Sequence, residues 1–177
     1  MHFYLTTTVL ALLCASAQAY DYLTATALVT NAANESALEC WRFATPLVDS
    51  SEPGIAGSLR FNFNASSASY TIIPPRFNGS RHNSPAPQLV VYTSGLAHIS
   101  LPSSKDEEWF IGGNQGLLVA ADTTGEGHIT EYPSEQYTSV LTIPFPDGMV
   151  PAHEKLSSGA CHFSSIGARS PQDRMWH

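Results

Sequence analysis

The feature that most constrains the fold is a series of short β-favouring runs that recur between turn residues, with almost no helical periodicity. Dipeptides such as Pro53-Gly54 and Gly112-Gly113 separate the runs. About ten strands at this spacing predict an all-β sandwich or closed barrel in a single domain. We expect strands at Leu23–Thr30, Leu38–Thr45, Ser58–Phe63, Tyr70–Ile73, Leu89–Thr93, Ala97–Leu101, Trp109–Ile111, Leu117–Ala121, His128–Tyr132 and Val140–Phe145.

The first 19 residues are typical of a secretory signal peptide. The segment from Phe3 to Ala15 is uncharged and largely apolar, and it leads to Ala17-Gln18-Ala19, the small-x-small pattern that precedes cleavage. The apolar run is too short to span a bilayer, and no later segment is a candidate membrane anchor. We therefore expect the protein in the secretory pathway, either secreted or in the vacuole lumen.

Cleavage after residue 19 leaves a predicted domain at 20–163 and, because 164–177 lack an apolar pattern, a flexible C-terminal tail. The mature chain keeps two cysteines, Cys40 and Cys161, which in an oxidising compartment most often form a disulfide. The alternative is a pair of buried thiols. Three N-glycosylation sequons also suit secretion; they begin at Asn34, Asn64 and Asn78.

Charge restricts the partners. The net charge is -7, from 8 basic and 15 acidic residues, and no cluster of Lys and Arg is present. Nucleic acids and anionic membrane surfaces are therefore poor partners. A small-molecule substrate is the partner that we expect.

Ser94-Gly95 lies between two strand-like runs and predicts a tight hairpin. Symmetric pairing would place Gln88, Tyr92 and His98 on one interior face. A buried Tyr/His pair either packs the core or contacts a ligand, so Tyr92 is a candidate substrate-binding residue.

The stretch from 81 to 132 carries the candidate chemistry. His82 and Gln88 are followed by six residues and Gly95, and further along Gly125 precedes His128 by three positions. Three inward-facing ligands, His82, Gln88 and His128, can hold one divalent metal and leave coordination positions open.

This spacing resembles the two-part signature of the cupin superfamily. The first part of that signature is His-x-His, three or four residues, Glu, six residues and Gly, and the second contains Pro-x-Gly-x-x-His. His82, Gln88 and Gly95 match positions of the first part, and Gly125 and His128 match the second. The resemblance implies a cupin-type (RmlC-like) jelly-roll β-barrel, and it also implies that two barrels can pair into a homodimer.

The sequence departs from that signature at three positions. Ser84 replaces the second histidine, Gln88 replaces the glutamate, and Thr123 replaces the proline. Two hypotheses remain open. In the first, the three ligands still bind Fe, Cu, Ni, Mn or Zn, with Glu126 or Glu131 as a fourth ligand.

In the second hypothesis the cavity is metal-free and His128 acts as a catalytic general base. Two further residues lie near these motifs. Arg76 follows Pro74-Pro75 and is a candidate for binding an anionic substrate at the cavity mouth. Asp122 ends a predicted strand and is expected to cap the following turn through its side chain.

Beyond the superfamily signature, the chain resembles small secreted cupins of filamentous fungi. The resemblance implies oxidative, dioxygenase-like tailoring of a small polyketide-derived ring compound in mycotoxin biosynthesis of the patulin type. Two alternatives are a metal-free isomerase or cyclase, and a secreted protein that binds a small ligand without catalysis. The matching motifs are Leu38-Glu39-Cys40-Trp41-Arg42, Pro74-Pro75-Arg76-Phe77, Pro87-Gln88-Leu89-Val90, Ala120-Ala121-Asp122-Thr123, Gly127-His128-Ile129-Thr130, Ile143-Pro144-Phe145 and Pro151-Ala152-His153.

Overall fold

The fold is all-β, as predicted from the strand spacing. The computed structural model describes residues 22–65 and 67–162, so the predicted signal peptide and C-terminal tail lie outside the described residues. Within these two ranges there is no α-helix, and η1 (Pro146–Gly148) is a short 3-10 turn. No helix in the described part of the chain is long and apolar enough to cross a membrane.

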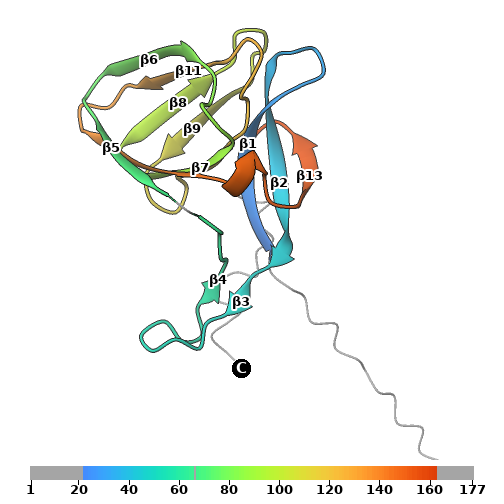
Figure 1. Cartoon of the computed structure of the whole chain (residues 1–177). Coiled ribbons are helices and arrows are strands. Elements are labelled where there is room, and N and C mark those ends of the chain that lie inside the picture. The colour runs from blue at the N-terminus through green and yellow to red at the C-terminus, as the bar shows by residue number, and fades with distance from the viewer. Residues whose placement is uncertain (1–21, 66, 163–177) are drawn as a thin grey trace, which may run out of the picture.

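Two sheets contain almost all of the strands (Figure 1). A separate two-stranded ribbon, β3 (Val48–Asp49) with β4 (Leu59–Arg60), extends away from them. The smaller sheet has the order β6 (Phe77–His82), β11 (His128–Tyr132), β8 (Leu96–Ser100), β9 (Glu107–Ile111). The larger sheet has the order β13 (His153–Ser158), β2 (Ser36–Pro46), β1 (Tyr22–Thr30), β10 (Leu117–Ala120), β7 (Gln88–Ser94), β12 (Thr138–Pro144), β5 (Ser69–Ile73).

The core follows from the alternation of side chains along the strands. In β1, Leu28 belongs to the cluster between the two sheets, whereas Ala25 and Ala27 belong to a second cluster on the other face of the larger sheet. In β7, Val90 and Tyr92 point toward the smaller sheet, and Leu89 belongs to the second cluster. The larger sheet is therefore apolar on both faces near its centre, and only one of these faces meets the smaller sheet.

The predicted hairpin at Ser94-Gly95 is wrong. β7 pairs with β10 and β12, whereas β8 pairs with β11 and β9, so the two strands lie in different sheets. Both edges of β7 are occupied, and the chain therefore turns at Gly95 (φ +80°) and crosses to the smaller sheet. On β8 it is Ile99 that points into the space between the two sheets. His98 lies on the opposite face of the strand, where its ring stacks on Trp109.

Two strands of the main sheets, and the short β3 of the ribbon, were not predicted from the sequence. β6 has the sequence Phe-Asn-Gly-Ser-Arg-His and β13 has His-Glu-Lys-Leu-Ser-Ser, and nearly all of their residues are exposed. Each lies at the edge of a sheet and is held by backbone pairing to one neighbour, so neither needs an apolar alternation. The predicted strand at Ser58–Phe63 is shorter than expected, because only Leu59–Arg60 pairs, within the ribbon.

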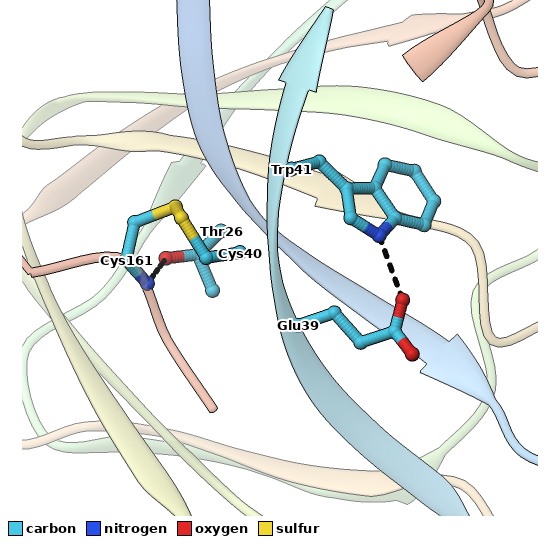
Figure 2. Close-up of a disulfide and its surroundings, with 5 residues drawn as sticks. All are labelled: Thr26, Glu39, Cys40, Trp41 and Cys161. Atoms are coloured by element: carbon cyan, nitrogen blue, oxygen red, sulfur yellow. Dashed lines mark hydrogen bonds between the residues drawn. A yellow bond between two sulfur atoms is a disulfide. The ribbon is translucent and has the colours of Figure 1, made fainter. Parts of the chain in front are cut away.

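The predicted disulfide between Cys40 and Cys161 is present (Figure 2). It joins β2 to the segment that follows β13, with the two Cα atoms 4.6 Å apart. The Cys161 amide donates a hydrogen bond to Oγ1 of Thr26 on β1. A disulfide is typical of proteins in an oxidising, secretory-type environment. All three sequon asparagines are exposed on the surface.

We expect loss of this disulfide to lower the free energy of unfolding by about 4–5 kcal/mol, because it closes a loop of 121 residues in the unfolded chain. Urea unfolding of the protein with and without reductant measures the effect. A Cys40→Ala, Cys161→Ala variant is the control and should not respond to reductant. Equal unfolding midpoints for the oxidised and reduced protein would contradict the prediction.

Candidate functional site

A cavity of about 220 Å³ lies between the two sheets, and it brings most of the predicted site residues together. His82, Gln88, Tyr92 and His128 all line it, from strands of both sheets. Much of the remaining wall is apolar and comes from the cluster between the sheets: Val90, Ile99, Leu118, Ala120 and Val140. An apolar cavity with a few polar groups is the usual form of a small-molecule site.

The two histidines are cross-strand neighbours. His82 on β6 lies directly opposite His128 on β11, and the centroids of their rings are 4.4 Å apart. His82 is exposed, whereas His128 is buried, with 5% of its surface accessible. Gly127 makes this approach possible, because it has φ +77° and a Cβ there would lie 2.5 Å from the His82 carbonyl oxygen.

Asp122 lies behind His128 and is fully buried. Its Oδ2 accepts hydrogen bonds from Nδ1 of His128 at 2.7 Å and from Oγ of Ser36 at 2.9 Å, and its Oδ1 accepts from Oγ of Ser84 at 2.7 Å. The expectation of a turn-capping role was wrong, because these three side chains are the partners of the carboxylate. A buried carboxylate needs such donors to offset the cost of its desolvation.

The hydrogen bonds fix the tautomers of both imidazoles. Nδ1 of His128 faces a carboxylate, and Nδ1 of His82 lies 3.0 Å from the carbonyl oxygen of Ser80. Both acceptors require a proton on Nδ1, so the neutral form of each ring has its lone pair on Nε2. The two residues can therefore act as proton acceptors or as ligands through Nε2.

Ser84 is held against Asp122 by two hydrogen bonds. Ser84 is buried, its backbone amide donates to the Asp122 carbonyl oxygen, and its hydroxyl donates to the carboxylate. The neighbouring Asn83 amide also donates to the carbonyl oxygens of Asp122 and Thr124. The segment between β6 and β7 is thus fastened to the residues that precede His128, and Ser84 is a support for Asp122.

Two tyrosines form the other polar part of the cavity. Tyr92 on β7 and Tyr132 on β11 both line it, one from each sheet. Burial raises the pKa of Tyr92 well above 10.0, and the nearby Tyr132 raises it further. Burial also raises the pKa of Tyr132, and the nearby Tyr92 partly opposes this rise. Both phenols are therefore protonated at neutral pH.

Other predicted residues lie away from the cavity. Arg76 is exposed and pairs with Glu135 on the outer surface. Glu131 points to the other face of β11, where a carboxylate oxygen lies 3.5 Å from Nδ1 of His98. Glu126 accepts a hydrogen bond from Ser103 at 2.6 Å. None of the three lines the cavity.

Sequence reasoning missed Ser36 and Tyr132, and it misread Asp122. Ser36 is 86 positions from Asp122 in sequence, and no local pattern links them. The signal for Tyr132 was available, because it shares the inner face of β11 with His128 at a spacing of four residues.

The donor set is only partly suited to a metal. No three His, Cys, Asp or Glu side chains converge to hold a metal ion anywhere in residues 22–65 and 67–162. Within the cavity, His82 and His128 have the orientation of metal-binding histidines, because each Nδ1–H is held by an oxygen acceptor. The third candidate, Gln88, offers a neutral amide oxygen.

Comparison with known proteins does not assign the chain to a family: no family model matches it, and no curated protein shows significant similarity.

We expect Ser84→Ala to destabilise the protein by about 1–3 kcal/mol, because it removes a donor from a buried carboxylate. Ser157→Ala, at an exposed position of β13, is the matched control and should change stability by less than about 0.5 kcal/mol. Urea unfolding of both variants tests this. Equal effects would show that Ser84 does not support Asp122.

The raised pKa of Tyr92 predicts a loss of stability at alkaline pH. The phenol binds its proton more tightly in the folded state than in the unfolded state. Its contribution is therefore fully present below pH 10.0 and is lost as pH rises from there through the folded-state pKa. Unfolding free energies measured from pH 8 to pH 11 should fall less steeply for Tyr92→Phe than for the wild type. Tyr137→Phe, at a residue that is 61% exposed, should follow the wild type.

Proposed function

We propose that this protein is a small-molecule enzyme of the cupin type that moves protons on a ring compound, as an isomerase or cyclase, without a metal. The observation that carries the proposal is the 2.7 Å hydrogen bond from Nδ1 of His128 to a fully buried Asp122, beside a cavity that His128 lines. A carboxylate in that position orients the imidazole and stabilises its charged form, which is the arrangement of a general base.

The proposed chemistry uses Nε2 of His128. This atom accepts a proton from a carbon or hydroxyl of the bound ring, and the resulting imidazolium is stabilised by Asp122. The same proton then returns at another position of the ring, so the product is an isomer of the substrate. The burial of Asp122 supports this step, because a charge has a stronger electrostatic effect in the protein interior than in water.

The cavity volume supports a single-ring substrate. A cavity of about 150 Å³ is large enough to bind benzene, and this one measures about 220 Å³. The cupin resemblance suggests the jelly-roll barrel as the architecture and fungal secondary metabolism as the setting. Because the motifs also resemble those of patulin synthesis protein J, we propose a small polyketide-derived ring compound as the substrate, processed in the secretory pathway.

A dioxygenase-like oxidoreductase is the second candidate. It is favoured by the orientation of His82 and His128, which both keep Nε2 available at the cavity. These two imidazoles with Gln88 would hold the divalent metal, which when bound would activate oxygen. The protein residues would then position the ring against the apolar wall and exclude water from it.

The test is the conversion of polyketide-derived single-ring compounds in D₂O by protein that has been dialysed against chelator. We expect products of unchanged composition apart from deuterium, and we expect His128→Gln to reduce the rate by about 10²–10⁴-fold. Asp122→Asn should also reduce the rate, because it changes the acceptor that orients His128. His82→Gln serves as the matched control, since it removes the neighbouring imidazole but not the proposed base.

The outcomes separate the candidate functions. Products that gain oxygen, with activity restored by metal and lost in both histidine variants, would establish the oxidoreductase. Binding without any turnover would overturn both enzymes in favour of a ligand-binding protein. Elemental analysis of the native protein beside a His82→Ala, His128→Ala variant shows independently whether the two imidazoles hold a metal.

A further inference from the structure

The two sheets are not joined by backbone pairing on the side formed by β5 and β6. β5 lies at the edge of the larger sheet and pairs with β12, and β6 lies at the edge of the smaller sheet and pairs with β11 (Figure 1). The chain passes directly from one strand to the other through Pro74, Pro75 and Arg76. The two prolines have no N–H group to donate across the gap.

A groove of about 360 Å³ lies between these two edge strands, and we call it the edge groove. Among the described residues, no Asp, Glu, Lys or Arg lines it. An uncharged and largely apolar groove favours an apolar occupant over an ionic one. Most of its wall comes from Ile72, Ile73, Pro74, Phe77, Gly79 and Tyr132.

The edge groove is continuous with the cavity. Thr71, Ile73, His82 and Tyr132 line both of them. Phe77 lies opposite Tyr132 in the pairing of β6 with β11, and the centroids of their rings are 6.2 Å apart. The wall of the cavity therefore continues from Tyr132 to Phe77 at the surface. A ligand held in the cavity can extend into the groove without crossing a strand.

The groove also exposes large apolar side chains. Phe77 is 46% exposed and Ile72 is 62% exposed, one from each of the two edge strands. Exposed apolar side chains that gather at a groove mark a binding surface. The shared lining favours a small molecule as the occupant, because a segment of another protein chain would cover the exposed groove but would not fill the cavity.

We propose that the edge groove binds an uncharged alkyl or alkenyl side chain of the compound whose ring occupies the cavity. This inference rests on the proposed function and names its substrate class, a single ring with a linear apolar side chain. His128 lines the cavity and is not part of the groove. The side chain therefore anchors and orients the ring and takes no part in the proton transfer.

The experiment measures the affinity for resorcinols that carry a methyl, propyl or pentyl group at carbon 5. The ring hydroxyls of these probes can donate hydrogen bonds to the Nε2 atoms in the cavity, and only the apolar chain differs among them. Isothermal titration calorimetry gives the dissociation constants. We expect the affinity of the wild type to rise by about two- to fourfold for each added CH₂ group, as apolar surface leaves water.

Variants at position 77 test where the chain binds. Phe77→Ser should weaken binding of the pentyl compound about three- to tenfold and leave binding of the methyl compound unchanged. Phe77→Leu keeps an apolar side chain and should retain most of the chain-length effect. Tyr70→Ser is the matched control, because Tyr70 is an aromatic residue of β5 that is 61% exposed and does not line the groove.

A measurement on the wild type keeps the proposal testable if Phe77→Ser does not fold. Intermolecular nuclear Overhauser effects should connect the terminal methyl group of the pentyl chain to the ring of Phe77, which lines only the groove. The aromatic protons of the same ligand should show contacts to Val140, which lines only the cavity. Contacts from the chain to Val140, or from the aromatic protons to Phe77, would overturn the assignment.

Failure of this inference and failure of the proposed function give different results. Equal affinity for the methyl and pentyl compounds in the wild type would overturn the chain subsite, whether or not proton transfer is found. A chain-length effect that depends on Phe77, in a protein that converts no ring compound in D₂O, would support the subsite and overturn the proton-transfer function.

Two further outcomes would overturn the assignment. If Phe77→Ser weakens binding of the methyl and pentyl compounds equally, Phe77 acts on the ring site and not on the chain. Analytical ultracentrifugation of the ligand-free protein tests a second copy of this chain as the occupant. A dimer of the wild type that dissociates in Phe77→Ser would assign the edge groove to that second copy.

Discussion

The buried carboxylate of Asp122 is the interaction on which the site depends. A buried charge costs several kcal/mol in lost hydration unless donors offset it, and here the donors come from three parts of the chain: Ser36 at the start of β2, Ser84 between β6 and β7, and His128 on β11. β2 belongs to the larger sheet and β11 to the smaller one. The same hydrogen bonds therefore join the sheets and orient the imidazole, so stability and function are coupled at this carboxylate.

A second polar pair, Tyr92 and Tyr132, lines the same cavity. Tyr92 comes from the larger sheet and Tyr132 from the smaller one, and burial keeps both phenols protonated. The rest of the wall includes medium-sized and small side chains, among them Val90 and Ala120. These do not fill the space between the sheets, so a cavity remains in a core that would otherwise be close-packed.

The sequence predicts the parts of this structure that depend on apolar alternation and on short spacings. It identified the all-β class, most of the strands in the two sheets, the disulfide between Cys40 and Cys161, and four residues that line one cavity, His82, Gln88, Tyr92 and His128. It did not predict the exposed edge strands β6 and β13, which have no buried face to produce a pattern. It also paired β7 with β8, because local turn chemistry does not reveal that β10 and β12 occupy both edges of β7.

The position of the Asp122 carboxylate favours a protonated His128 over a metal ion bound at Nε2. In a site made of two histidines and a carboxylate, the carboxylate binds the metal directly and offsets its charge. In this cavity the amide of Gln88 is neutral, and the nearest buried carboxylate, Asp122, bonds to Nδ1 of His128 on the side away from Nε2. A divalent cation at the two Nε2 atoms would contact only neutral donors. A proton on Nε2 of His128, in contrast, produces an imidazolium in direct contact with Asp122. Asp122 is therefore placed to stabilise a protonated His128 more directly than a metal ion at Nε2.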